Sequence, residues 1–232
     1  MYYGIFDPTY ILVIIGIVIT LAASAKVKTT FGKYSRVGSA SGMTGAQVAE
    51  RLLRDAGIYD VRIERISGDL NDHYDPKNKV LRLSDPVYGQ TSLAAIGVAA
   101  HECGHAIQHQ ESYAPLNIRS ALVPVANIGS MAAWPLIILG LLLSFNQTLI
   151  YLGIILFGAA VLFQIITLPV EFNASKRAIQ KLGQTGILYG DELKHSKKVL
   201  DAAALTYVAA AAATILQLLR LIILFGGGRS RD

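Results

Sequence analysis

The sequence predicts a mainly α membrane protein with about four transmembrane helices and a small α+β segment between the first two. Uncharged apolar residues are gathered into runs long enough to cross a bilayer, which takes roughly 20 residues. Charged residues make up only 16% of the 232 residues, against about 25% in soluble proteins. Helical and alternating patterns follow one another in residues 26–119, which we expect to form the α+β segment.

The first apolar run, residues 8–25, predicts transmembrane helix 1. A cleaved signal peptide is the alternative, because "AASA" resembles a cleavage site. Signal peptides begin with basic residues, whereas here no Lys or Arg precedes the run, and Lys26 and Lys28 follow it. We therefore expect an uncleaved membrane anchor.

The middle of the chain carries no charge from Ser120 to Val170. This length is enough for two transmembrane helices, at residues 121–143 and 149–170, with the polar "SFNQT" as the turn between them. A last apolar run predicts a fourth helix at residues 203–225. It contains Arg220, so a full span and a shallow or re-entrant helix both remain open.

Basic residues indicate the orientation, because cytoplasmic loops of membrane proteins are enriched in Lys and Arg. The first eight residues contain none, whereas residues 26–119 begin with a basic stretch and the helical segment 171–200 is also basic. We expect the N-terminus outside and both segments in the cytoplasm. Arg229 and Arg231 conflict with this orientation, since an outgoing fourth helix would leave them outside.

The α+β segment is expected to contain a helix, two strands and a second helix. Thr44 and Gln47 have the spacing of a capping box, which marks the start of the first helix. Alternating residues predict the strands, and Asp and Pro residues predict a turn between them. The strands are expected at residues 61–67 and 79–84, and the turn at residues 75–78. The second helix is expected to begin at Thr91.

The second helix contains "HECGH", in which His101 and His105 stand four residues apart and share one helix face. This spacing lets both imidazoles bind one Zn²⁺. Glu102 lies beside the metal, where it can take a proton from a water that the metal activates. The alternative is a polar helix end without a metal. Cys103 is expected to pack as an apolar group, and Gly104 to leave room for metal or substrate.

A catalytic zinc site uses three protein ligands and leaves one position open. His109, a further turn along the helix, is rotated off the shared face and is expected outside the ligand set. Glu171 is the favoured third ligand, because the topology places it on the same membrane side as the histidines. An ordinary carboxylate at the membrane interface is the alternative for Glu171, and the competing candidates are Asp191, Glu192, His195 and Asp201.

Three stretches, "HECGHAIQ", "HYDPKNKVLRLS" and "LPVEFNASKRA", set among four apolar runs, resemble the YugP-type membrane zinc metallopeptidases of bacteria. The resemblance extends over nearly the whole chain. It implies a minimal gluzincin-like core with a β-hairpin and one catalytic Zn²⁺. It also implies that His101, His105 and Glu171 bind the metal and that Glu102 is the general base.

A more distant similarity, to peptidases that pair H-E-x-x-H with E-x-x-A-D, concerns the residues around the ligands. Here Ser175 stands where that pattern has the aspartate that orients a histidine. We expect Ser175 or Asn173 to take over this task, because ligand histidines need a partner for their second nitrogen.

Substrate contacts are also implied by the resemblance. Related enzymes hold the peptide along an edge strand, expected here at Val80, Leu81, Arg82 and Leu83. His73 or Tyr74 would donate a hydrogen bond to the oxyanion, the alternative being that both belong to a turn.

Together these features predict a zinc-dependent endopeptidase in the bacterial cytoplasmic (plasma) membrane, with its active site on the cytoplasmic face. Its partners would be the lipid bilayer and a protein or peptide substrate, and a regulatory membrane partner is left open. Nucleic acid is not expected, because the basic residues are spread along the membrane edge. The alternatives are intramembrane cleavage and a catalytically silent metal-binding scaffold.

Overall fold

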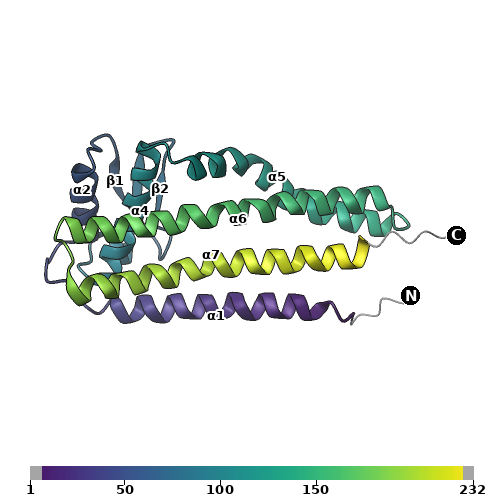
Figure 1. The fold of residues 1–232 in the computed structure, drawn as a ribbon, viewed down its shortest axis with the longest axis horizontal. Coiled ribbons are helices and arrows are strands. Elements are labelled where there is room, and N and C mark those ends of the chain that lie inside the picture. Colours follow the sequence, from purple (N-terminus) through teal and green to yellow (C-terminus); the bar gives the residue numbers. More distant parts are fainter. Residues whose placement is uncertain (1–6, 227–232) are drawn as a thin grey trace. The chain divides into compact units, whose positions relative to one another are not determined.

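The computed structural model describes residues 7–226, and within this range the chain forms seven helices and three strands (Figure 1). The fold is therefore mainly α with a small sheet, as the sequence predicts. The elements are α1 (Tyr10–Tyr34), α2 (Gly45–Asp55), β1 (Arg62–Ile66), β2 (His73–Asp75), β3 (Val80–Ser84), α3 (Asp85–Tyr88), α4 (Leu93–Gln110), α5 (Ala114–Leu142), α6 (Gln147–Gln184) and α7 (Gly190–Phe225).

The chain divides into two compact units. The apolar unit comprises residues up to Ala23, Ile118–Leu168 and residues from Thr206 onward. The polar unit comprises Ser24–Asn117 and Pro169–Leu205, and it contains α2, the sheet, α3 and α4. Each unit has its own hydrophobic cluster, so they are described separately.

Four of the described helices, α1, α5, α6 and α7, are long and apolar enough to cross a membrane. In the apolar unit, large side chains such as Ile17, Val18 and Leu21 of α1 are more than half exposed. An apolar surface of this kind is typical of a helix in contact with lipid. This agrees with the predicted number of transmembrane helices.

The helices are longer than the apolar runs from which they were predicted. α6 continues from Gln147 to Gln184 without a break where the uncharged run ends, even though Pro169 lies inside it. The end of an apolar run marks a change in the surroundings of the side chains. The backbone hydrogen bonds of a helix do not depend on those surroundings, so the helix continues.

Arg220 is neutralised inside the apolar unit. Its guanidinium lies 3.2 Å from Asp7 and 3.1 Å from the Thr9 hydroxyl, and its charged carbon is 4.3 Å from the centre of the Tyr10 ring. α7 is an unbroken helix through this position. An ion pair with a partly buried carboxylate therefore accounts for the charge without a re-entrant turn. Arg229 and Arg231 lie outside the described residues.

In the polar unit, α2 begins as predicted. The Thr44 side chain accepts a hydrogen bond from the Gln47 backbone, and the Gln47 side chain accepts one from the Thr44 backbone. The apolar stripe of α2, which includes Val48 and Leu52, is fully buried in the cluster that also holds the apolar side chains of α4. This packing anchors the helix that carries the histidines.

The sheet has three strands in the order β1–β3–β2. β2 and β3 are antiparallel and form a β-hairpin, whereas the two strands expected from the sequence, β1 and β3, pair in parallel. The sequence pattern missed β2, which has only three residues, and the one-turn helix α3. Segments this short are below the length at which periodicity is informative.

The prediction that Val80, Leu81, Arg82 and Leu83 form an edge strand is wrong. β3 lies in the middle of the sheet, with β1 on one side and β2 on the other. Val80, Leu81 and Leu83 are completely buried, as expected for a central strand. The edges of this sheet are β1 and β2.

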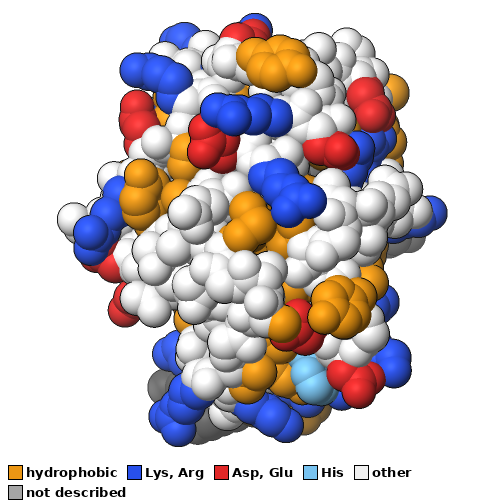
Figure 2. Space-filling view, turned by 90° about the vertical axis from the view of Figure 1, so that its left-hand side faces the viewer, with side chains coloured by type: hydrophobic (Ala, Val, Ile, Leu, Met, Phe, Trp, Pro, Cys, Tyr) orange, Lys and Arg blue, Asp and Glu red, His pale blue; other side chains and the backbone are white. Residues whose placement is uncertain are grey.

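The surface of the polar unit carries charges of both signs. Figure 2, which views the side that lies to the left in Figure 1, shows Lys and Arg side chains interspersed with Asp and Glu. Arg54 pairs with Glu50 and Arg65 with Asp85, both at the surface. Such a surface is typical of contact with water and contrasts with the exposed apolar helices.

Gly104 allows α4 and α6 to pack closely within the polar unit. A Cβ atom at this position would lie 2.5 Å from the carbonyl oxygen of Ala174. The prediction that Gly104 leaves room for metal or substrate is therefore wrong, because the α6 backbone fills that space.

We predict that Gly104→Ala destabilises the polar unit by about 1–3 kcal/mol, the usual cost of overpacking. Cys103, the single cysteine, is buried, so its reaction with a thiol reagent during heating reports loss of packing around α4. The reaction should begin at a lower temperature in Gly104→Ala. Gly32→Ala is the matched control, since a Cβ there would contact nothing within 4 Å. Equal heat resistance of the two variants would contradict the packing argument.

Candidate metal centre

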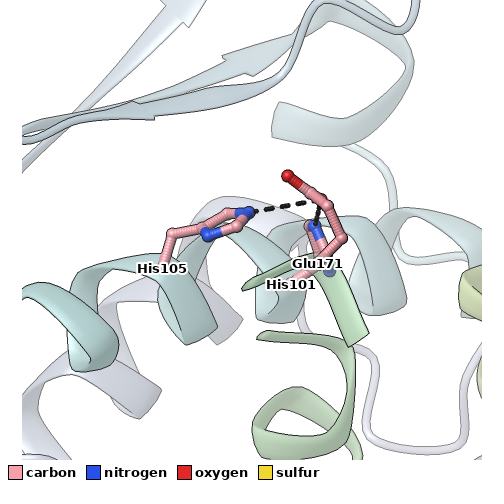
Figure 3. Close-up of side chains that lie close together, drawn as sticks. All are labelled: His101, His105 and Glu171. Atoms are coloured by element: carbon pink, nitrogen blue, oxygen red, sulfur yellow. Dashed lines mark hydrogen bonds and ion pairs between the residues drawn. The ribbon is translucent and has the colours of Figure 1, made fainter. Parts of the chain in front are cut away.

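Two helices of the polar unit supply the site. His101 and His105 lie on one face of α4, whose N-terminus is capped by the Ser92 side chain accepting from the Ala95 backbone. Glu171 belongs to α6 and points at both imidazoles (Figure 3). The structure thus brings Glu171 next to two histidines from which it is far apart in the sequence.

The three side chains are spaced as zinc ligands are. Glu171 Oε2 lies 3.2 Å from His101 Nε2 and 3.6 Å from His105 Nε2. All three ligand atoms lie within 4.8 Å of one another. Two ligand atoms of tetrahedral Zn²⁺, each at about 2.0–2.2 Å from the metal, are roughly 3.3 Å apart. The residues therefore fit a zinc ion without a large rearrangement.

Charges in the site reinforce one another. Burial alone would raise the pKa of Glu171, but the hydrogen bonds and charges of His101 and His105 outweigh it and lower the pKa. Burial alone would lower the pKa of His105, but Glu171 and Glu102 outweigh it and raise the pKa. The two histidines thus stabilise the negative charge of the Glu171 carboxylate. A bound cation would stabilise the same charge.

Ser175 orients the first histidine. Its hydroxyl lies 3.0 Å from His101 Nδ1, so that Nε2 faces Glu171. The sequence predicts this contact for either Ser175 or Asn173, and Ser175 stands where related motifs have an aspartate. A hydroxyl accepts the Nδ1 proton without adding a charge to the site.

Gln108 orients the second histidine, and sequence reasoning missed this role. The Gln108 side chain is fully buried, and its amide nitrogen donates to the Val170 carbonyl at 2.8 Å and to Asn173 Oδ1 at 3.0 Å. Its oxygen must therefore accept the hydrogen bond from His105 Nδ1, at 3.0 Å. With the proton on Nδ1, the Nε2 lone pair faces the Glu171 carboxylate. The Nε2 lone pair and the Glu171 carboxylate are both acceptors, so they need a proton or a metal ion between them.

Asn173 acts on the site through Gln108 rather than by touching a histidine. Its Oδ1 also accepts a hydrogen bond from Arg177 Nε at 2.6 Å, and Arg177 pairs with Glu111 at 2.7 Å. A chain of side chains thus links His105 to the surface. The spacing of Gln108, three residues after His105 and on the same helix face, is the signal that could have identified it.

Glu102 is a buried carboxylate without a partner. Its side chain is 7% exposed and makes no hydrogen bond or ion pair with any residue between 7 and 226. It lies close enough for its charge to raise the pKa of His105 and, after burial, that of Cys103. A buried carboxylate that lacks a partner destabilises the folded state, and such groups are concentrated at functional sites.

The other candidates for the third ligand are engaged elsewhere. Asp191 pairs with Lys194, Asp201 pairs with Lys197, and Glu192 accepts a hydrogen bond from the Ala40 backbone at 2.8 Å. His195, the remaining candidate, is half-buried. Its ring stacks on Tyr34 with 5.0 Å between ring centres.

Tyr74, His73 and His109 lie outside the group of three ligands. The Tyr74 hydroxyl is 2.9 Å from His109 Nδ1, and burial, together with Asp60 and Asp75, raises the pKa of Tyr74 to about 12. The exposed His73 contacts the Asn71 carbonyl at 2.9 Å. Both residues belong to β2 rather than to a turn, and an oxyanion role for either stays a prediction.

Cys103 packs as expected. The side chain is 1% exposed, burial raises its pKa, and its sulfur lies 3.6 Å from the Ala49 carbonyl oxygen. It supplies packing between α4 and α2 and no ligand.

Comparison with known proteins agrees with this site. The family described as "Putative neutral zinc metallopeptidase" matches residues 9–226. The chain belongs to this family, and four of its described helices are long and apolar enough to cross a membrane. It is 53% identical over 210 residues to "Putative membrane protease YugP" of Bacillus subtilis (strain 168), which covers 90% of this chain and 93% of that protein. No solved structure matches the chain.

We predict that Gln108→Leu weakens zinc binding by about 10–100-fold, the usual effect of removing a side chain that orients a ligand. Competition with a chelator of known affinity measures this change directly. Gln110→Leu is the matched control, because Gln110 lies on the same helix but is exposed. If both variants bind zinc as the wild type does, the Gln108 side chain does not hold His105 in place.

Proposed function

We propose that the protein is a zinc-dependent endopeptidase of the cytoplasmic membrane. The observation that carries this proposal is a buried carboxylate without a partner, Glu102, directly beside a cluster of two histidines and a glutamate. Membership of the zinc metallopeptidase family supports it. The printed name of the B. subtilis relative, a membrane protease, also supports it.

In this proposal His101, His105 and Glu171 hold one catalytic zinc ion. Three protein ligands leave a position open for water or substrate. When bound, zinc lowers the pKa of water and polarises the carbonyl group of a peptide. Ser175 and Gln108 keep the Nε2 lone pairs of the two histidines directed at the metal position.

Glu102 would act as the general base. Its carboxylate has no internal partner, so it is available to accept a proton from the attacking water. The same group then returns the proton to the nitrogen of the departing amine, which completes hydrolysis of the peptide bond. Its buried position keeps the proton transfer away from bulk solvent.

An extended peptide would pair with β2. Strand addition needs a free strand edge, which the central strand β3 does not have. β2 is an edge strand, and Tyr74 connects it to His109 on the helix that carries the histidines. The backbone of β2 would bind the substrate without requiring particular side chains.

The site is proposed to face the cytoplasm. The basic residues that follow the first and third apolar runs favour this orientation, with the N-terminus outside. α4 is not among the four described helices that are apolar enough to cross a membrane, which disfavours cleavage inside the bilayer. A regulatory membrane partner that controls access to the site would be compatible with this arrangement.

The zinc and activity test uses Glu102→Gln and Glu171→Ala. Glu102→Gln should keep its zinc but lose at least about 100-fold in casein hydrolysis, because it removes only the proton acceptor. Glu171→Ala should lose both zinc and activity, since it removes a ligand. Glu50→Gln, an exposed residue of α2, is the control.

Two results would contradict this proposal in different ways. Full zinc occupancy in Glu171→Ala would mean that Glu171 is not a ligand. Wild-type cleavage by Glu102→Gln would mean that another group is the base. A protein that binds zinc but cleaves nothing in the wild-type form would favour the metal-binding scaffold.

The orientation can be tested with a membrane-impermeant maleimide in a Cys103→Ala background. Asp69→Cys, at an exposed position of the polar unit, should be labelled in inverted membrane vesicles and not in intact spheroplasts. Gln147→Cys, at the exposed first residue of α6, should give the opposite result. Labelling of Asp69→Cys in intact spheroplasts would place the site outside.

A further inference from the structure

A second feature of the polar unit is a cavity of about 550 Å³ lined by the ends of α1 and α7 that belong to this unit. Lys26 and Lys33 line it from α1, and Lys198 lines it from α7. Lys26 and Lys33 stand seven residues apart, two helical turns along one face of α1. The cavity is separate from the residues of the metal centre.

These three lysines lack a counter-ion, as Lys28 and Lys77 also do, but they are the ones that line a common cavity. Other lysines of the polar unit, such as Lys181, Lys194 and Lys197, are paired with aspartates at 2.7–2.8 Å. Within residues 7–226, Lys26, Lys33 and Lys198 form no ion pair. Asp201 also lines the cavity, but both of its carboxylate oxygens are bound by Lys197.

The side chains of Lys26, Lys33 and Lys198 are exposed, so water screens their charges from one another, and an anion in the cavity would be attracted by all three. Thr30, which also lines the cavity, has no hydrogen-bond partner for its hydroxyl within the described range. Ammonium and hydroxyl groups are the donors that bind phosphate oxygens. The lining is therefore suited to a phosphate group.

The apolar part of the lining indicates what is attached to the phosphate. Ala202 and Leu205 line the same cavity, and Leu205 is 46% exposed. Lys26 directly follows the uncharged run of residues 8–25, and Ala202 opens the uncharged run that ends before Arg220. Both walls thus continue into segments suited to lipid, so a ligand here would have an anionic head and an apolar tail.

We propose that this cavity binds the headgroup phosphate of an anionic phospholipid. The three lysines and Thr30 bind the phosphate, and Ala202 and Leu205 contact the start of the acyl chains. Tyr34, which is buried and stacked on His195, forms a rigid wall of the site. This site is independent of the metal centre and of the proposed peptidase activity.

The test measures lipid binding to the full-length protein by native mass spectrometry in detergent. Phosphatidylglycerol is the anionic probe and phosphatidylcholine the zwitterionic one, with matched acyl chains. A lysine near an anionic membrane surface contributes about 1 kcal/mol, or roughly fivefold in affinity. Lys33→Gln/Lys198→Gln should therefore weaken phosphatidylglycerol binding about tenfold or more, with little effect on phosphatidylcholine.

Lys28→Gln/Lys77→Gln is the matched control. It removes the same charge from two exposed lysines that have no ion pair within the described residues and do not line the cavity. This variant should bind phosphatidylglycerol within about twofold of the wild type. Lys33→Arg/Lys198→Arg, which keeps both charges, should retain binding.

Three outcomes would overturn the proposal. Equal weakening of phosphatidylglycerol binding in both glutamine variants would indicate that the lipid responds to the net charge of the protein and not to this cavity. Unchanged binding of phosphatidylglycerol to Lys33→Gln/Lys198→Gln would mean that the cavity is not the lipid site. Displacement of phosphatidylglycerol by millimolar inorganic phosphate would identify a soluble phosphate as the ligand. Protection of Cys103 from thiol reagents in every variant verifies that the polar unit is folded.

Discussion

The close contact between α4 and α6 beside Gly104 is the constraint on which the metal centre depends. A Cβ at Gly104 would come within 2.5 Å of the Ala174 carbonyl, so only glycine allows the two backbones this approach. Gly104 precedes His105, and Ala174 follows Glu171 by three residues. The same contact therefore sets the distance between the two ligands on α4 and the one on α6. A shift of one helix along the other would separate the carboxylate from both imidazoles.

Hydrogen bonds across this contact complete the arrangement. Ser175 holds one imidazole from α6, and Gln108 holds the other from α4 while its amide is bound to Asn173 and Val170 of α6. Each of these buried polar groups has a partner, as a stable interior requires. Glu102, in contrast, makes no hydrogen bond or ion pair within the described residues, which fits the proton-accepting role proposed for it.

Charge is treated differently in the two units. In the apolar unit Arg220 is matched by Asp7, which fits a surrounding that solvates charge poorly. In the polar unit most lysines of α7 pair with an aspartate on the same helix, yet those around the cavity beside α1 do not. The charge of Arg220 is balanced by the Asp7 carboxylate. The lysines around the cavity have no such partner within the described residues, which fits the binding of an external anion. The proposed peptidase site and the proposed lipid site are thus separate parts of the polar unit.

Local patterns in the sequence determined the number of membrane helices, the capping box of α2, the helical spacing of His101 and His105, and the choice of Glu171 as a nearby carboxylate. These features depend on helical periodicity and on runs of one residue type, which act over a few turns of chain. Tertiary structure decided the rest. It placed β3 in the centre of the sheet, it filled the space beside Gly104 with the α6 backbone, and it gave Gln108 its role. Each of these depends on which segment packs against which, and local patterns in the sequence do not specify that pairing.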